Sequence, residues 1–310
     1  MVSGRTVSRG LAVGLTAAMW SGMAMAMEQP AVIPASEVRD VVARSGLAYR
    51  IFVGKPQREA PRGGYPVLYV LDGNAVFGTA VETMRLQSWR SEVSGVDPTL
   101  IVAIGYPGDA ALSLDRRALD YTPRPAGVAA DARSGGADAF LDFIETELKP
   151  QIERDLPVDR SRQALFGHSF GGLFVLHALF NRPGTFQAYV AASPSIWWHD
   201  RTILAAEASF VARASGIAPK PRLLITVGAD EQPQVPAAAL PSPHLTRIAS
   251  ARMVEEAEAL AGRLAASGAL PVAFVSFAGE NHASVIPAAL SRALRFAGRR
   301  AEPPSAPDVP

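Results

Sequence analysis

Short apolar blocks alternate along the chain with longer segments of helical spacing. Most of these blocks are rich in β-branched and aromatic residues, as is typical of strands buried on both faces. They lie at 65–71, 100–104, 164–166, 188–192, 222–227 and 272–277. The segment 47–53 instead alternates between apolar and polar residues, which predicts an antiparallel edge strand.

Helical spacing is clearest over 137–156, where Phe140, Ile144, Leu148 and Ile152 form one stripe. Further helices are expected at 170–180, 245–266 and 283–297. Buried strands that alternate with helices predict an α/β fold. Its central sheet should be mostly parallel, with helices on both faces.

Two segments interrupt this alternation. Residues 107–136 show no clear strand or helix and carry several Arg and Asp side chains, and residues 231–244 are rich in Pro and Ala. Loops of this length in a compact domain usually form lids or binding loops, or are disordered. We expect 107–136 to be an irregular, lid-like insertion, and the pattern favours no interpretation of 231–244. The Pro-rich residues 301–310 predict a disordered tail.

The N-terminal residues have the features of an export signal. Arg5 and Arg9 precede an apolar segment at 11–20, which is too short to cross a bilayer, and the small-x-small triplet 24–26 follows. We therefore expect a signal peptide at 1–26, a mature domain at 27–300 and a periplasmic location. The open alternative is an uncleaved N-terminal anchor. No later segment predicts a transmembrane helix, so no stable membrane insertion is expected after cleavage.

Composition narrows the possible chemistry. The 30 Lys and Arg residues nearly balance the 29 Asp and Glu residues, for a formal net charge of +1. Bulk charge therefore gives no reason to expect a nucleic-acid partner, although a local basic patch stays possible. The chain contains no Cys, which excludes disulfides, thiolate metal sites and Cys nucleophiles.

Residues 167–171 read Gly-His-Ser-Phe-Gly and match the G-x-S-x-G pattern. In this pattern the serine sits on a strained turn between a strand and a helix, so that its hydroxyl points outward. An apolar strand is predicted before the motif and a helix after it, which is the required context. Ser169 is therefore the candidate nucleophile, and the Phe170 N–H is a candidate oxyanion donor. The alternative is a Gly-rich turn that serves only packing.

In α/β-hydrolases an acid and then a histidine follow the serine, each after a later strand. His282 stands between the last predicted strand and the last predicted helix, which fits the general base. Asp230 and Glu231 follow the strand at 222–227, and either can be the acid. A Ser-His dyad is the alternative. His168 is expected to orient or pack rather than react.

A second oxyanion donor should come from the loop after an earlier strand. Gly73 and Asn74 follow the strand at 65–71, so their backbone N–H groups are the candidates. The alternative is an ordinary Asp-Gly turn.

Several separated motifs resemble the periplasmic siderophore trilactone esterases, a group of α/β-hydrolases that cleave the serine trilactone of enterobactin and salmochelin. The motifs are GYPVLYVLDGNA at 64–75, RALDYTP at 117–123, RSGG at 133–136, GHSFGG at 167–172 and ASPS at 192–195. The resemblance implies an α/β-hydrolase fold and a siderophore substrate, ferric or iron-free. Related bacillibactin esterases carry V-G-x-x-E, which residues 227–231 resemble, and this favours Glu231 over Asp230.

The resemblance also implies roles for charged and aromatic residues. Ferric tris-catecholates are anionic and aromatic, so guanidinium groups suit them by charge and by stacking. Arg117 matches the family's arginine and is the first expected substrate contact, with Arg116 beside it; the alternative is a solvated loop. Trp197 and Trp198 are expected to form an aromatic wall, or else to pack in the core. No metal or organic cofactor is implied, since iron would arrive only with the substrate.

The prediction is a serine esterase that works through an acyl-enzyme on a small-molecule ester. The alternatives are a general carboxylesterase for feruloyl, acetyl or short acyl esters, an acyltransferase, and a siderophore-binding protein with weak chemistry.

Overall fold

The computed structural model describes residues 1, 31–125, 127–129, 133–233, 242, 246 and 249–298. Apart from residue 1, the expected signal peptide at 1–26 lies outside these residues, as does the tail at 301–310, so the predicted domain limits stay predictions. Contacts divide the chain into Met1–Ile33 and Pro34–Pro310, and all the described helices and strands belong to the second unit. Within the described residues, no helix combines the length and apolarity needed to cross a membrane.

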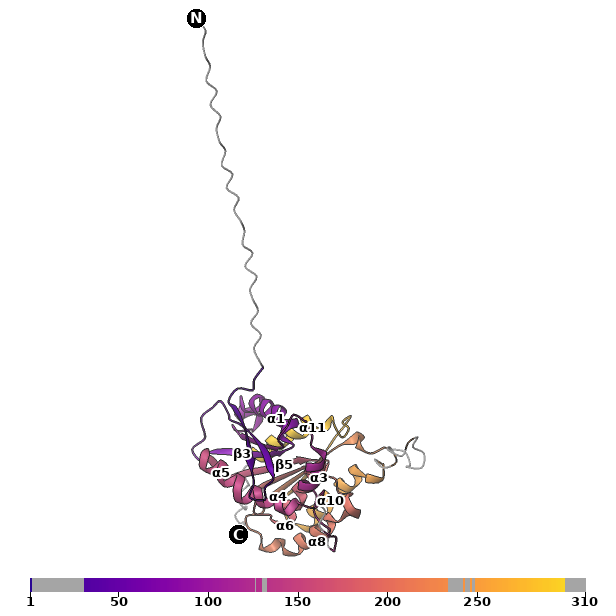
Figure 1. Ribbon diagram of the computed structural model, residues 1–310. Helices are drawn as coiled ribbons and strands as arrows, with labels where there is room; N and C mark the ends of the chain where they lie inside the picture. Colours follow the sequence, from indigo (N-terminus) through magenta and orange to yellow (C-terminus); the bar gives the residue numbers. More distant parts are fainter. Residues whose placement is uncertain are drawn as a thin grey trace. The chain divides into compact units, whose positions relative to one another are not determined.

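A single sheet forms the centre of the domain (Figure 1). Its strands in the described residues are β1 Ser36–Val42, β2 Ala48–Gly54, β3 Tyr65–Leu71, β4 Leu100–Gly105, β5 Val158–His168, β6 Ala188–Ala192, β7 Arg222–Gly228 and β8 Val272–Phe277. Their order is β1-β2-β4-β3-β5-β6-β7-β8. The β1–β2 and β2–β4 pairs are antiparallel, and the six strands β4, β3, β5, β6, β7 and β8 run parallel to one another. The predicted mostly parallel α/β sheet is confirmed.

The edge strand was predicted wrongly. Residues 47–53 do form an antiparallel strand, but β2 lies between β1 and β4, and β1 is the edge. The sequence of β1 contains no apolar run, because its side chains are mostly exposed or half-buried. Instead, Arg50 of β2 pairs with Asp40 of β1 (2.7 Å), and Lys55, directly after β2, pairs with Glu37 of β1 (3.1 Å).

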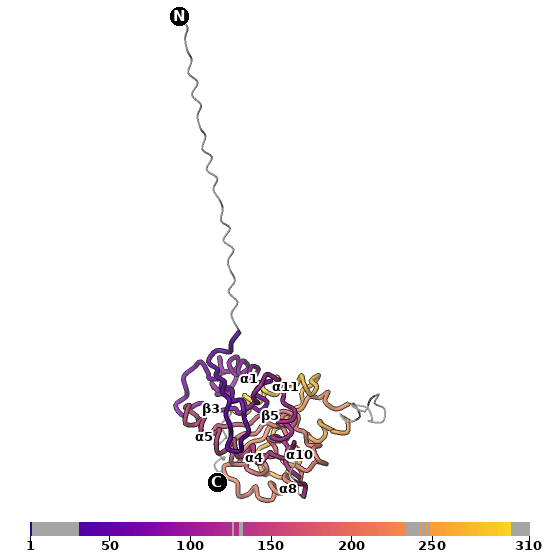
Figure 2. Tube along the Cα trace, viewed as in Figure 1, coloured from indigo at the N-terminus to yellow at the C-terminus, as the bar shows by residue number. Residues whose placement is uncertain are grey.

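Helices cover both faces of the sheet. The described ones are α1 Gly73–Ser88, α2 Ser91–Ser94, α3 Leu114–Tyr121, α4 Ala137–Phe143, the π-helix η1 Ile144–Leu148, α5 Lys149–Asp155, α6 Phe170–Asn181, α7 Trp198–Arg201, α8 Ile203–Arg213, the 3₁₀ helices η2 Ala214–Gly216 and η3 Ala229–Glu231, α10 Met253–Ser267 and α11 Val285–Gly298. Figures 1 and 2 show α1 and α11 side by side, and contacts between them agree.

Alternation along β3 separates the two layers of the core. Val67, Tyr69 and Leu71 join the main apolar cluster, which includes buried residues of α4, α6, α8 and α10. Leu68 and Val70 are equally buried but lie outside that cluster, on the other face of the sheet. The helix α6 is apolar all round because it is buried between the sheet and other helices.

The insertion at 107–136 is not irregular throughout. Residues Leu114–Tyr121 form α3, which packs against α4 and α6. This helix was missed because two of its three buried side chains, Arg117 and Asp120, are charged, so apolar periodicity does not reveal its inner face. The insertion thus places a buried arginine, Arg117, on a helix that packs against α6.

Candidate active site

The backbone at Ser169 is strained. Ser169 lies between the end of β5 and the start of α6. Its backbone angles are φ 61° and ψ −117°, a conformation that residues other than Gly rarely adopt. Its N–H donates to the Ala192 carbonyl (3.0 Å), and its own carbonyl accepts from the N–H groups of Leu173 (3.0 Å) and Ser195 (3.1 Å). These bonds hold the turn, and Ser169 is half-buried.

Glycines around Ser169 let strand and helix approach each other. A Cβ on Gly167 would lie 2.3 Å from the Gly171 carbonyl oxygen, and one on Gly172 would lie 2.7 Å from the Ala192 carbonyl oxygen. No larger residue fits at either place without moving backbone. The G-x-S-x-G-G pattern therefore reflects close packing at the turn.

Glu231 and His282 meet at the end of the sheet. The Glu231 Oε2 atom lies 2.7 Å from His282 Nδ1. Its Oε1 atom accepts from the Ser193 hydroxyl (2.5 Å) and from the Gly228 N–H (2.6 Å). The Glu231 side chain is fully buried, whereas that of His282 is 47% exposed. With Nδ1 facing the carboxylate, the Nε2 atom of His282 is left to act as a base.

The carboxylate of the neighbouring Asp230 does not take the position of Glu231 beside His282. Asp230 is exposed, and its backbone N–H bonds to the Glu280 carbonyl (3.0 Å). Of the two predicted acids, the structure brings only Glu231 to His282.

The turn that carries His282 is fixed at both ends. Asn281 Oδ1 accepts from the N–H groups of Ala283 (2.9 Å) and Ser284 (3.1 Å), as a helix N-cap does. On the other side, a Cβ on Gly228 would lie 2.3 Å from the Glu280 carbonyl oxygen. The loop before His282 therefore rests directly on the end of β7.

Ser169 and His282 line one cavity of about 210 Å³. The Ser169 hydroxyl hydrogen-bonds to Ser195 Oγ (3.4 Å). Within the described part of the chain, it makes no hydrogen bond to His282. Catalytic hydrogen bonds are often long in ligand-free sites and shorten when substrate binds.

Arg117 also lines this cavity, and it is buried. Its Nε atom donates to Asp72 Oδ1 (2.7 Å), and Nη2 donates to the His168 carbonyl (3.4 Å). Its guanidinium carbon lies 5.9 Å from the centroid of the Phe170 ring. Burial raises the pKa of Asp72, and the Arg117 charge acts against this rise.

The structure does not bring Arg116 to the cavity. Its guanidinium group donates to the Ala48 carbonyl (3.0 Å) and to Asp120 (3.1 Å). It lies over the rings of Tyr49 (4.9 Å) and Tyr106 (4.7 Å). Adjacent residues on a helix point in different directions, and here Arg117 rather than Arg116 lines the cavity with Ser169.

Trp197 and Trp198 contact Phe170, the residue that follows Ser169, rather than the cavity itself. The Phe170 ring lies 5.9 Å from that of Trp197 and 5.1 Å from that of Trp198. Trp197 is 38% exposed, and neither tryptophan lines the cavity. Together with Phe170, the residue after Ser169, they form an aromatic group.

His168 packs against the proposed base. Its ring centroid lies 4.5 Å from that of His282. Burial, together with the charges of His282 and Arg117, lowers the pKa of His168 to about 3. His168 is therefore neutral near pH 7 and adds no second positive charge at the site.

The candidate oxyanion donors lie at two helix starts. Phe170 is the first residue of α6, and Gly73 and Asn74 are the first residues of α1. N–H groups in a first helical turn have no acceptor within the helix. The Asn74 side chain bonds to the backbone of Tyr106 (2.8 and 3.0 Å). Asp72 and Ala75 line the cavity, whereas Gly73 and Asn74 do not.

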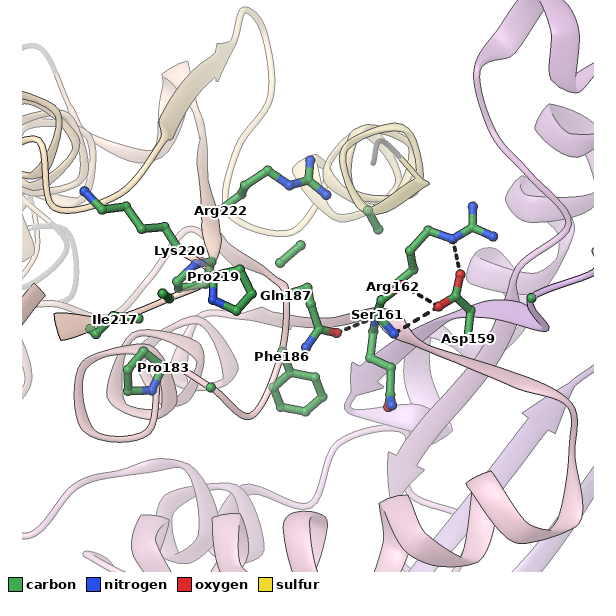
Figure 3. Close-up of a pocket in the computed structure, with 17 residues that line it drawn as sticks. Asp159, Ser161, Arg162, Pro183, Phe186, Gln187, Ile217, Pro219, Lys220 and Arg222 are labelled. Atoms are coloured by element: carbon green, nitrogen blue, oxygen red, sulfur yellow. Dashed lines mark hydrogen bonds and ion pairs between the residues drawn. The ribbon is translucent and has the colours of Figure 1, made fainter. Parts of the chain in front are cut away.

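A larger cavity of about 770 Å³ lies at the amino ends of the parallel strands (Figure 3). The starts of β5, β6 and β7 line it, and it contains none of Ser169, Glu231 or His282. Its buried Arg162 is neutralised by Asp97 (2.6 Å) and Asp159 (2.7 Å). In α/β sheets, ligands bind at the carboxyl ends of the strands, which favours the smaller cavity as the reaction site.

Sequence reasoning missed several residues of the site. Asp72 was considered only as part of a turn, and Ser193 and Ser195 only as part of a family motif. Gly228 entered only as part of the V-G-x-x-E pattern at 227–231. Their roles depend on contacts between distant segments. The ASPS motif at 192–195 was the one signal that pointed to two of them. Among the described residues, no group of His, Asp and Glu side chains could hold a metal ion.

The chain belongs to the putative esterase family, whose model matches residues 44–268. The ferri-bacillibactin esterase BesA of Bacillus subtilis is 40% identical over 86% of this chain and 90% of its own length. The BES protein of Bacillus cereus shares 37% identity and a TM-score of 0.76, over 88% of this chain and 99% of that one. The enterobactin hydrolase IroE, in a complex with DFP, shares 27% identity and a TM-score of 0.61, over 85% and 94%.

These comparisons confirm the family resemblance and the α/β-hydrolase fold. The chain is a carboxylic ester hydrolase of the serine type. The roles of individual site residues remain predictions, supported by the geometry above.

Gly228→Ala should impair activity without unfolding the protein. The added Cβ would push the Glu280 carbonyl away and move His282 with it. We expect kcat/KM for p-nitrophenyl butyrate to fall by about a hundredfold, because small displacements of a catalytic group have large effects. Gly262→Ala is the control, since a Cβ there meets nothing within 4 Å. Equal activities of the two variants would contradict the packing argument.

The Arg117–Asp72 pair should contribute strongly to stability. Arg117→Met leaves the Asp72 carboxylate buried without its partner, and we expect the free energy of unfolding in urea to fall by about 3–5 kcal/mol. Arg117→Met combined with Asp72→Asn should regain part of this loss, because no unpaired charge remains. Asn also tolerates the left-handed backbone at Asp72, where φ is 59°. A double variant no more stable than the single one would argue against the pair.

Proposed function

We propose that this chain hydrolyses the ester bonds of a catecholate siderophore, with Ser169 as nucleophile, His282 as general base and Glu231 as the acid that orients it. The observation that carries the proposal is the buried Glu231 carboxylate 2.7 Å from His282 Nδ1, at the cavity that Ser169 lines. The relatives support the substrate class, since their names specify ferri-bacillibactin and enterobactin.

The first half of the reaction forms an acyl-enzyme. The Ser169 oxygen attacks an ester carbonyl while His282 Nε2 takes the hydroxyl proton. Glu231 stabilises the imidazolium that results. The candidate donors to the oxyanion are the backbone N–H of Phe170, at the start of α6, and that of Gly73 or Asn74, at the start of α1. The C–O bond then breaks, and the departing alkoxide takes the proton from His282.

The second half releases the acid. Water loses a proton to His282 and attacks the acyl carbon, and Ser169 regains its proton as the product leaves. Applied to a trilactone, one cycle opens the ring into a linear trimer, and further cycles shorten it. No step requires a resident metal, and iron enters only as part of a ferric substrate.

Arg117 is proposed to contact the substrate near the reacting ester. It is the cationic side chain that lines the cavity with Ser169, and the Phe170 ring lies beside it. A guanidinium group can hydrogen-bond catecholate or carbonyl oxygens and can stack on aromatic rings. The cavity of about 210 Å³ is below the usual range for ligand pockets, so it accommodates one ester and its nearest ring.

The direct test separates the chemistry from the substrate. Purified wild type and Ser169→Ala are assayed on p-nitrophenyl butyrate, and iron-free and ferric enterobactin are each analysed by mass spectrometry after incubation. We expect wild type to yield linear trimer and smaller products, and Ser169→Ala to lose at least about a thousandfold in kcat.

Undiminished activity of Ser169→Ala would refute the assigned nucleophile. Turnover of the p-nitrophenyl ester without cleavage of either form of enterobactin would refute the siderophore and favour another ester, such as a feruloyl ester. Siderophore binding without turnover, seen as quenched tryptophan fluorescence, would favour a binding protein.

We also propose that the protein is exported to a bacterial periplasm. The proposal is supported by Arg5 and Arg9, the apolar segment 11–20 and the triplet 24–26. On expression in a Gram-negative host, the periplasmic protein should begin at Met27, as read by N-terminal sequencing. Ala26→Gln should block cleavage and leave the full chain at the membrane. A cytoplasmic wild-type protein that keeps Met1 would refute export.

A further inference from the structure

The turn after β6 carries two buried serines. Residues Ala192, Ser193, Pro194 and Ser195 form the ASPS motif, and both serines are almost completely inaccessible to solvent. Ser193 has φ 44°, a left-handed conformation that is uncommon for residues other than Gly. Its N–H donates to the Thr226 carbonyl of β7 (2.7 Å), which anchors the strained turn to the neighbouring strand.

The Ser193 hydroxyl contacts the acid rather than the nucleophile. It donates to Glu231 Oε1 at 2.5 Å, and the Gly228 N–H donates to the same oxygen at 2.6 Å. The Oε2 atom is thereby left to His282 Nδ1, at 2.7 Å. A buried carboxylate needs such donors, because burial without them opposes its negative charge.

We propose that Ser193 is a positioning residue that acts on the reaction through Glu231. Its hydroxyl holds one carboxylate oxygen, so that the other faces His282 in the orientation that keeps the imidazole ready to accept a proton. Ser193 does not line the cavity, and therefore it does not contact the substrate. The proposal rests on the triad assigned under the proposed function.

Geometry distinguishes this role from simple packing. A residue needed only for the strained turn would serve as well, or better, as Gly, because Gly adopts positive φ without strain. A residue needed for its hydroxyl cannot be replaced by Gly or by Ala. The local backbone conformation and the hydrogen bond therefore make opposite predictions for Ser193→Gly.

The test compares Ser193→Ala and Ser193→Gly with wild type on p-nitrophenyl butyrate. We expect both variants to lower kcat by about tenfold or more, as loss of a hydrogen bond to a charged group predicts, with KM changed less than about twofold. Inactivation by a fluorophosphonate should slow by a similar factor. Ser88→Ala is the matched control. It removes a buried serine hydroxyl whose contacts, Met84 Sδ and the Arg85 carbonyl (both 3.5 Å), stay within α1.

Two further measurements report on Glu231 itself. In a Glu231→Gln background, Ser193→Ala should change kcat by less than about twofold, because the charge that Ser193 holds is gone. In proton NMR spectra at low temperature, the far-downfield signal of the His282 Nδ1 proton should weaken in both Ser193 variants and persist in Ser88→Ala.

Each outcome decides the proposal. Full activity of Ser193→Gly, or equal losses from Ser193→Ala with and without Glu231→Gln, would overturn it. Loss of activity in Ser169→Ala with no loss in the Ser193 variants would leave the nucleophile in place and reject only the role of Ser193. Full activity of Ser169→Ala would instead reject the proposed function on which the inference rests.

Discussion

The site depends on one buried negative charge. The Glu231 side chain has no contact with solvent, so protein groups must supply every favourable interaction that water would otherwise give it. Those groups come from separate segments: Ser193 after β6, Gly228 at the end of β7 and His282 after β8. Since these three strands are parallel neighbours, their carboxyl ends lie at one edge. The carboxylate therefore draws the β6, β7 and β8 loops together, and the base is positioned as a consequence.

Close approach of backbone makes this convergence possible. At Gly167 and Gly172 the nucleophile turn meets α6 and the β6 strand, and at Gly228 the His282 loop meets β7. At all three places a Cβ would come within 3 Å of a carbonyl oxygen. The strained conformations of Ser169 and Ser193 persist because hydrogen bonds to neighbouring strands hold both turns. The same edge of the sheet thus combines tight packing with stored strain, which is typical of catalytic sites.

Much of this architecture could be predicted from the sequence, because buried parallel strands and the nucleophile turn leave local patterns. The apolar runs indicated the strands from β3 to β8, and the order of serine, acid and histidine indicated which loops carry chemistry. The predictions that failed, for β1 and α3, share one physical cause. The strand β1 and the helix α3 present polar side chains where apolar ones are expected, since ion pairs such as Arg117–Asp72 replace apolar contacts. The directions of Arg116 and Arg117, and the contact of Ser193 with Glu231, depend on tertiary packing that no local pattern encodes.

The electrostatics of the cavity follow from the same pairing. Arg117 brings a positive charge to the nucleophile, but Asp72 lies 2.7 Å from it, so the pair adds little net charge. His168 is neutral near pH 7, because burial lowers its pKa to about 3. An anionic siderophore would therefore not be held here by net positive charge. It would instead be recognised by directed hydrogen bonds from the Arg117 guanidinium, which Asp72 holds in place. Such recognition selects the shape and donor pattern of one arm of the ligand, which suits a cavity that holds one ester at a time.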